Sequence, residues 1–295
     1  MTIAPAELGA TRAFSIPQRG KLHDIFRRHP TAMAGAILLG LLILMAIFAP
    51  FLGTVDPQAL APVRRLRAPS ATYWFGTDML GRDVYSRVVY GSRVSLIIGI
   101  SVALFSAAVG ICLGLLTGFV RLADAILMRI MDGLMSIPSV LLAIALMALT
   151  RASMGNVIFA ITVAEVPRVT RLVRGVVLTL REQPFVEAAI ASGTSFLPIL
   201  WRHILPNTLA PVLVQGTFIA ASAMITEAAL SFIGAGTPPN IPSWGNIMAE
   251  GRSLFQVAYY IILFPGICLS LAVLSINLIG DGLRDALDPR LARRM

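Results

Sequence analysis

Charged residues are scarce in this sequence of 295 residues. They make up 13% of the chain, whereas about 25% is typical of a soluble domain. Hydrophobic residues make up 57%, and the mean hydropathy is +0.81. A soluble globule of this size needs a polar surface that so few charges cannot supply. The composition therefore argues against a soluble enzyme and predicts an integral membrane protein.

Lysine and cysteine are also nearly absent, which excludes several kinds of site. The only lysine, Lys21, is followed by Leu22 and lies outside any G-x-x-x-x-G-K-[ST] segment that could cradle phosphates. Cys112 and Cys268 lie inside apolar runs and predict neither a disulfide framework nor a metal site. No His-Glu-x-x-His or Cys-x-x-Cys segment occurs. We therefore expect this chain to hold no catalytic residue, metal or cofactor.

Arginine is the residue in excess. The net charge is +9 and the isoelectric point about 10.7. A basic excess can indicate nucleic-acid binding, but arginines in the cytoplasmic loops of a membrane protein also account for it and fit the hydropathy. We expect no nucleic-acid partner.

Several charge-free stretches are long enough to cross a bilayer, which takes about 20 apolar residues as a helix. A shorter stretch, 152–164, leads into Arg168, Arg171 and Arg174, which repeat every three residues on one helix face. We count it as a span with a polar cytoplasmic half, the fourth of six. The other five spans are predicted at 31–55, 94–120, 133–150, 204–226 and 253–280.

Six spans put both termini on one side of the membrane. With the N-terminus inside, 16 of the 24 basic residues lie inside, as the positive-inside rule expects. The sequence thus predicts a cytoplasmic tail at 1–29 and one membrane domain at 30–295. Two external segments are predicted at about 56–92 and 234–252.

The two external segments contain many turn residues and several aromatic residues. Trp74, Trp244, Tyr259 and Tyr260 are residue types that favour the membrane interface. We expect these segments to form ordered caps rather than plain loops.

Small residues and prolines in the spans predict how the helices pack. The repeat Gly110-x-x-x-Gly114-x-x-x-Gly118 allows close helix approach, and we expect that contact inside one bundle rather than between subunits. Pro138 and Pro265 are expected to kink the third and sixth spans.

Few acidic residues lie near the membrane, and Asp132, Glu165 and Glu227 are the candidates. An ionisable residue within a membrane is a functional candidate by default. Each of these lies near the end of its stretch, so we expect a local partner or snorkelling rather than a proton relay. No chain of carboxylates crosses the bilayer, which argues against a proton-driven transporter.

The segment 181–207 is the most informative part of the sequence. Pro184 can open a short helix and Gly193 can close it, a second short helix can follow, and Pro206 marks the start of the fifth span. The surface around Ala188 and Ala189 is small and smooth, which suits docking into a partner's groove. The alternative is an amphipathic connector that lies on the membrane surface.

One group of residues in this segment resembles the EAA loop of ABC importer permeases: Glu187, Ala188, Ala189, Gly193, Leu205 and Pro206. The general pattern has isoleucine two residues before Leu205. This sequence has His203 there, which resembles the peptide and nickel branch. Other stretches are similar to the second permease of dipeptide and oligopeptide importers, at 74–87, 230–234, 242–245 and 277–289. The resemblance covers about residues 28–291.

The resemblance implies a type I ABC importer permease, an all-α bundle of about six transmembrane helices in a bacterial cytoplasmic (inner) membrane. It implies that the EAA loop is a coupling helix seated in a cytoplasmic ATPase. The implied partners are a second similar permease, two ATPase subunits that hold ATP and Mg, an extracytoplasmic solute-binding protein and membrane lipid. The implied coupling residues are Glu187, Ala188, Ala189, Gly193, His203, Leu205 and Pro206.

The resemblance favours peptides as the substrate, while nickel chelates, glutathione, opines and oligosaccharides remain alternatives. A secondary transporter is a more distant alternative, which would need its own ion or proton site. The sequence does not identify the residues that line the pathway, because near-uniform apolar runs do not reveal the rotation of each helix.

Overall fold

The computed structural model describes residues 30–287, without the side chain of Phe196. The predicted tail at 1–29 and the last residues of the 277–289 motif lie outside this range. The described part is all-helical, as predicted, and its only β pairing is an isolated bridge between Thr77 and Asp83.

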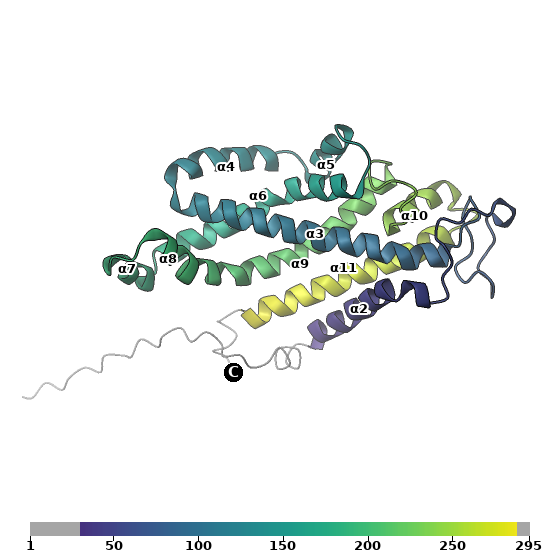
Figure 1. Cartoon of the computed structure of the whole chain (residues 1–295), viewed down its shortest axis with the longest axis horizontal. Helices are drawn as coiled ribbons and strands as arrows, with labels where there is room; N and C mark the ends of the chain where they lie inside the picture. Colours follow the sequence, from purple (N-terminus) through teal and green to yellow (C-terminus); the bar gives the residue numbers. More distant parts are fainter. Residues whose placement is uncertain (1–29, 288–295) are drawn as a thin grey trace, which may run out of the picture.

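Long helices form the body of the molecule (Figure 1). They are α2 (Pro30–Ile47), α3 (Val84–Phe119), α4 (Arg121–Met135), α5 (Ser139–Ala148), α6 (Met154–Arg181), α9 (Leu205–Phe232) and α11 (Tyr260–Leu287). Shorter elements join them: η1 (Ala49–Phe51), η2 (Pro62–Arg64), α7 (Pro184–Ala191), α8 (Phe196–Ile199), η3 (Leu200–Ile204), α10 (Trp244–Gly251) and η4 (Arg252–Leu254).

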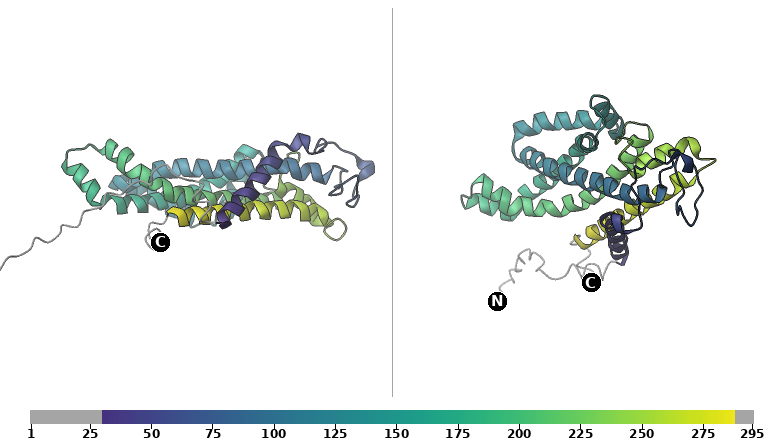
Figure 2. Two further views of the ribbon diagram at one scale, coloured as in Figure 1. Left: turned by 90° about the horizontal axis from the view of Figure 1, so that it is seen from below. Right: turned by 45° about the vertical axis from the view of Figure 1, so that its right-hand side comes forward.

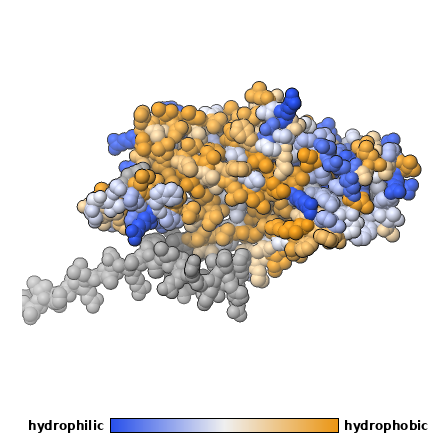
Figure 3. Space-filling view, in the orientation of Figure 1, coloured by the Kyte–Doolittle hydropathy of each residue, from blue (hydrophilic) through white to orange (hydrophobic). Residues whose placement is uncertain are grey.

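Most of the long helices run along one axis and leave the short elements at its two ends, whereas α5 turns away at 91° to α4. α7 and α8 lie at one end, and α10 with the segment before α3 lies at the other (Figure 1). α2 crosses α11 obliquely (Figure 2). Apolar residues gather around the middle of the molecule and hydrophilic residues toward the ends (Figure 3), the distribution a bilayer requires.

Four helices are long and apolar enough to cross a membrane: Pro30–Ile47, Val84–Phe119, Leu197–Phe232 and Tyr260–Leu287. The bent pair α4 and α5 makes five if it counts as one span. The doubtful stretch 152–164 belongs to α6, which has 28 residues and carries a glutamate and several arginines. The crossing of the membrane by 152–164, the fourth predicted span, and with it the total of six spans, therefore stays a prediction.

α6 packs against α3 along the glycine repeat, as predicted. A Cβ added at Gly110 would lie 2.5 Å from Val169 Cβ, and one at Gly114 would lie 2.5 Å from Val173 Cβ. A Cβ added at Gly118 would likewise lie too close to the Val177 side chain. The two helices thus run parallel at a separation that only glycine permits.

The third span is broken rather than kinked. The sequence predicted one helix over 133–150 with a kink at Pro138, but α4 ends at Met135, α5 begins at Ser139, and the two axes differ by 91°. Pro138 disfavours a helical conformation at the residue before it and cannot donate to the preceding turn. The helix therefore stops, and the chain leaves in a new direction.

The first external segment, predicted at about 56–92, already contains the start of α3, which begins at Val84. The Asp83 carboxylate accepts hydrogen bonds from the Ser86 backbone N–H and hydroxyl, at 2.8 and 2.5 Å. This N-cap starts the helix before the charge-free stretch 94–120, so α3 includes the predicted second span and extends beyond it.

The prediction of two separate short helices after α6 is half correct. α7 is separate, but α8 continues through the π-helical turn η3 into α9, and Leu197–Phe232 forms one helix of 36 residues. Pro206 lies at the junction where the π-helical turn η3 passes into α9.

Candidate functional site

The candidate coupling residues lie on α7 and on the turn that follows it. Pro184 is the first residue of α7, where its fixed φ favours helix formation. Gly193 follows the C-cap with a φ of +78°, a left-handed conformation that glycine adopts without strain. Its backbone N–H donates to Ile190 O at 2.9 Å, and the Thr194 N–H donates to Ala189 O at 3.0 Å. The predicted start and end of this helix are confirmed.

α7 is held by one face and open on the other. The Val186 side chain is 1% exposed and belongs to the core shared by α3, α6 and α9. Ala189 packs against that core, whereas Glu187, Ala188 and Ile190 are exposed. Among the described residues Glu187 has no ion-pair partner. The exposed face of α7 is thus short, has a small side chain at Ala188, and carries one acidic side chain, Glu187.

The other candidate residues lie where η3 meets α9. The His203 ring is 6.2 Å from the Phe185 ring, which brings α7 and η3 together. Leu205 packs against the same core as Ala189, while Pro206 is exposed. The structure therefore groups His203 and Leu205 with α7, and it places Pro206 on the exposed side of the junction between η3 and α9.

Arg181, which was not among the predicted coupling residues, links the end of α6 to the end of α3. Its guanidinium donates to Gly118 O at 2.8 Å and lies 5.6 Å from the centre of the Phe119 ring. Beside it a polar cavity of about 350 Å³ reaches Asp124 and Glu187. The end of α6, from which the chain runs into α7, is therefore tied to the end of α3.

Arginines of α6 also bind α4. Arg174 makes a two-point ion pair with Asp124, at 2.5 and 2.8 Å, and Arg171 pairs with Asp132 at 2.6 Å. The sequence predicted that these arginines share a face and that Asp132 has a local partner, and both predictions are confirmed. The Arg174–Asp124 pair was missed because it spans 50 residues.

A buried ion-pair network lies at the opposite end of the molecule. The Arg87 guanidinium, 1% exposed, donates to Asp78 at 2.7 Å and to Glu250 at 2.5 and 2.9 Å. Arg82 contacts the same two carboxylates at 2.6 and 2.7 Å. These bonds join the first external segment, α3 and α10, so the prediction of ordered caps is confirmed.

Glu227 fastens the second external segment. It is fully buried near the end of α9 and accepts hydrogen bonds from the Ser231 and Ser243 hydroxyls, both at 2.8 Å. Asn246 then ties the loop itself by donating to Thr237 O at 3.1 Å. The predicted local partner for Glu227 is therefore present.

Two of the four predicted interface aromatics lie in the core instead. Trp244 is fully buried and its ring N–H donates to Val88 O at 3.0 Å. Tyr260 is 3% exposed and its hydroxyl donates to Thr77 O at 3.1 Å. Both polar tips find backbone partners, which allows deep burial. Trp74 and Tyr259 are more than half exposed, as an interface residue requires.

Comparisons with known families agree with this geometry. Residues 110–293 match the family described as the binding-protein-dependent transport system inner membrane component. Residues 23–69 match the N-terminal transmembrane domain of oligopeptide transport permease C. The two matches include α2 and every helix from α4 to α11.

Several similar proteins cover almost the whole chain. A probable peptide ABC transporter permease of Sinorhizobium fredii is 51% identical over 97% of this chain and 99% of its own length. A dipeptide transport system permease of Alkalihalophilus pseudofirmus is 43% identical over 90% of this chain and 88% of its own. A glutathione transport system permease of Pectobacterium atrosepticum is 41% identical over 93% and 92%.

The fold is also similar to a solved structure. An inward-facing form of the MetNI methionine ABC transporter superposes with a TM-score of 0.54 at 21% identity. The match covers 68% of this chain and 96% of that one. At this identity the likeness concerns the fold alone.

Proposed function

The chain belongs to the family of binding-protein-dependent transport system inner membrane components, and from this membership we propose that it is the permease subunit of a peptide importer. The names of the similar permeases, peptide and dipeptide among them, support this substrate class. The observation that carries the mechanism is α7, anchored by one buried residue and open on its other face.

We propose that α7 is the coupling helix and that it docks on a cytoplasmic ATPase subunit. The small side chains of Ala188 and Ala189 let a partner approach the helix backbone closely, and Glu187 offers a free carboxylate. Gly193 closes the helix so that the chain can return to the membrane. The chain returns toward the membrane through the junction of η3 and α9, and this junction supports α7 on the side away from the ATPase. It contains His203, Leu205 and Pro206.

Motion of α7 has a physical route into the bundle. Val186 is embedded between the long helices, and Arg181 links the end of α6 to the junction of α3 and α4. The Arg174–Asp124 pair links the same α6 segment to α4. When ATP closes the ATPase subunits, their displacement therefore moves α3, α4 and α6 together. A complete switch between inward-open and outward-open states takes about 5.5 kcal/mol of differential affinity.

The remaining parts of the machine belong to other polypeptides in this proposal. Two ATPase subunits hold ATP and Mg, a second similar permease completes the pathway, and an extracytoplasmic solute-binding protein delivers the substrate. The excess of arginine on the α7 side supports placing α7 and both termini in the cytoplasm. The tail at 1–29 and the membrane domain at 30–295 follow from the same topology.

Purification of the tagged chain from its native membrane in mild detergent tests this proposal. We expect a second permease and one or two P-loop ATPases to co-purify. The complex is then placed in liposomes and assayed for ATP-driven uptake of peptides, with glutathione and a nickel chelate as competing substrates. A lone chain or a homo-oligomer that transports without ATP would overturn the proposal and favour secondary transport.

A further inference from the structure

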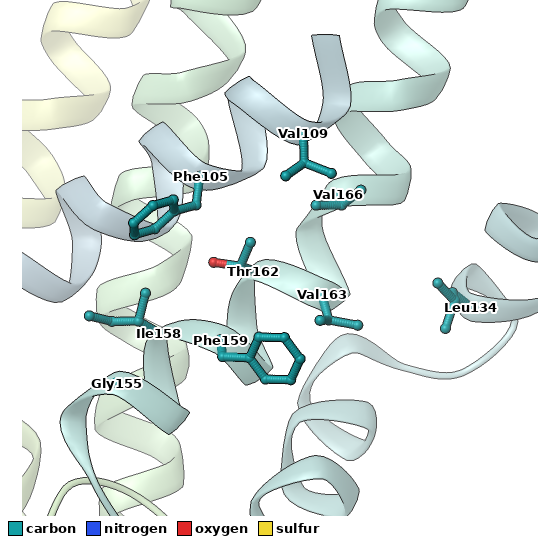
Figure 4. A pocket seen from close by; sticks show the side chains of 9 residues that line it. All are labelled: Phe105, Val109, Leu134, Gly155, Ile158, Phe159, Thr162, Val163 and Val166. Atoms are coloured by element: carbon teal, nitrogen blue, oxygen red, sulfur yellow. The ribbon is translucent and has the colours of Figure 1, made fainter. Parts of the chain in front are cut away.

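A cavity opens where α4 and α5 part. Its volume is about 460 Å³, within the range of about 300–1,000 Å³ typical of small-molecule sites. α3, α6 and the last turn of α4 form its walls (Figure 4). Its lining includes Phe105, Val109, Leu134, Phe159 and Thr162. We call this cavity the break pocket.

The break pocket lies at membrane depth. Phe105 and Val109 are near the middle of the charge-free stretch 94–120 of α3. α6 is held at a fixed level beside α3, because Gly110 meets Val169 one helical turn beyond the pocket. Leu134 reaches the same level, so α4 ends about halfway across the bilayer.

The side of the bundle that carries the break is not suited to lipid. The three residues that join α4 to α5 are exposed on the surface of the molecule: Ser136, Ile137 and Pro138. Non-helical backbone at membrane depth is tolerated only where protein covers it or where it lines a water-filled cavity. Asp132 and Arg171, each about half exposed, form an ion pair on the α7 side of the break.

Thr162 gives the break pocket its one polar group. The side chain is 8% exposed, and its hydroxyl has no hydrogen-bond partner among the described residues. A threonine in a helix can bond the carbonyl one turn back, as Thr170 does with Val166 O at 2.9 Å. The Thr162 hydroxyl instead points into the space between Phe105 and Ile158 (Figure 4). A buried hydroxyl left unpaired is costly, which indicates a ligand that supplies the partner.

We propose that the break pocket is a subsite of the translocation pathway that receives one apolar side chain of the transported peptide. The apolar walls take the side chain, and the Thr162 hydroxyl bonds a polar group of the peptide backbone. A lipid acyl chain offers that hydroxyl no partner, and occupation by a side chain of a second permease is an outcome that the test distinguishes. The inference rests on the proposed function and adds the part of the substrate that this subunit recognises.

The first test measures selectivity in the complete transporter reconstituted in liposomes. Val109→Phe fills the pocket from an exposed position, and Leu104→Phe adds the same ring at a neighbouring position outside the pocket. Two tripeptides of equal charge, with phenylalanine or alanine at the same position, serve as substrates. We expect Val109→Phe to lower the ratio of their kcat/KM values about tenfold, the effect of a few methylenes in an apolar pocket. Leu104→Phe should leave the ratio unchanged.

The second test measures access from water and does not depend on transport. In a background with Cys112→Ala and Cys268→Ala, we expect Phe159→Cys, at an exposed position in the pocket lining, to react with a water-soluble methanethiosulfonate reagent. The phenylalanine peptide should slow that reaction more than the alanine peptide. Leu41→Cys, exposed near the middle of α2, should stay unreactive because it faces lipid.

The outcomes separate this inference from the proposed function. A wild-type complex that imports peptides while Val109→Phe keeps the wild-type ratio overturns the inference alone. So does a Phe159→Cys that is as unreactive as Leu41→Cys, or a cross-link that places a side chain of the second permease in the pocket. A wild-type complex without ATP-driven uptake of either peptide overturns the proposed function and the inference with it.

Discussion

At the scale of single residues, Gly193 acts through its backbone and not through the room around it. No heavy atom of the described chain lies within 4 Å of the position a Cβ would take, while φ is +78°. Left-handed backbone costs about 1–2 kcal/mol for ordinary L-residues, and branched residues are affected most. Gly193→Val should therefore displace the turn after α7 even though the side chain has space.

Two variants at this position separate conformation from bulk. We expect Gly193→Val to reduce peptide uptake per ATP several-fold, and Gly193→Asn, which adopts the left-handed conformation more readily, to stay close to the wild type. Uptake and ATPase activity are measured on the same reconstituted complex. Equal losses in both variants would mean that the solvent-exposed surface, and not the turn, is what Gly193 provides.

Glu187 gives a second prediction at the residue scale. Its carboxylate is exposed, so Glu187→Lys should change the stability of the bundle by no more than about 0.5 kcal/mol. If α7 docks on an ATPase, the reversed charge should nevertheless uncouple ATP hydrolysis from uptake. Glu182→Lys, at an exposed position just before α7, is the matched control. An equal effect of both changes would point to the general charge of this end rather than to docking by α7.

At the scale of elements, the glycine repeat sets the distance between α3 and α6. A Cβ at Gly114 would lie 2.5 Å from Val173 Cβ and 2.9 Å from Thr170 O. Gly114→Ala should therefore destabilise the purified complex by about 1–3 kcal/mol through overpacking. Gly175 lies on α6 with open space around it, so Gly175→Ala should be neutral or stabilising by about 0.5–1 kcal/mol. Thermal unfolding in detergent measures both, and a lower midpoint for Gly175→Ala would contradict the packing argument.

The external network gives the other prediction at this scale. Arg87→Gln leaves the Asp78 and Glu250 carboxylates with Arg82 as their remaining cation partner. Removing one partner of a buried ion pair costs about 3–5 kcal/mol, so we expect a markedly lower unfolding midpoint. Arg171→Gln breaks a half-exposed pair and should cost about 0–1 kcal/mol. Similar midpoints for the two variants would show that the external network contributes little to stability.

The elements also show which features a sequence can reveal. Charge-free stretches predicted most long helices, because an apolar run of that length has few other environments. The start of α3 was missed because Asp83 caps a helix that extends beyond the apolar stretch. The burial of Trp244 and Tyr260 was missed because their partners, Val88 O and Thr77 O, lie more than 150 residues away.

The candidate site was predictable to a similar extent. Pro184 and Gly193 act locally, so their effect on α7 follows from the sequence. Val186 as the anchor and Arg181 as the link depend on how helices rotate and pack, which near-uniform apolar sequence does not determine. The break at Pro138 was anticipated in position but not in size, since a proline permits a range of bends and the neighbouring helices select one.

At the scale of the whole molecule, the two ends differ in how they are held. The external end is fixed by buried ion pairs and hydrogen bonds around Arg87 and Glu227. The α7 end is held by apolar packing of Val186, Ala189 and Leu205, by a ring contact and by the Arg181 bond at the end of α6. A force applied to α7 is therefore passed through these contacts to the long helices. The molecule is built to move at the end where the ATPase is proposed to dock.

Arg181 tests this view of the whole molecule. Its charge-assisted bond to Gly118 O is worth about 1.5–3 kcal/mol when shielded and less at an exposed position. Losing about 1.4 kcal/mol of coupling changes a conformational equilibrium about tenfold. We expect Arg181→Gln to leave assembly and ATPase activity intact and to lower peptide uptake per ATP by up to that factor. Arg202→Gln, an exposed arginine on η3, is the control. If Arg181→Gln transports normally, the displacement of α7 must reach the bundle through Val186 alone.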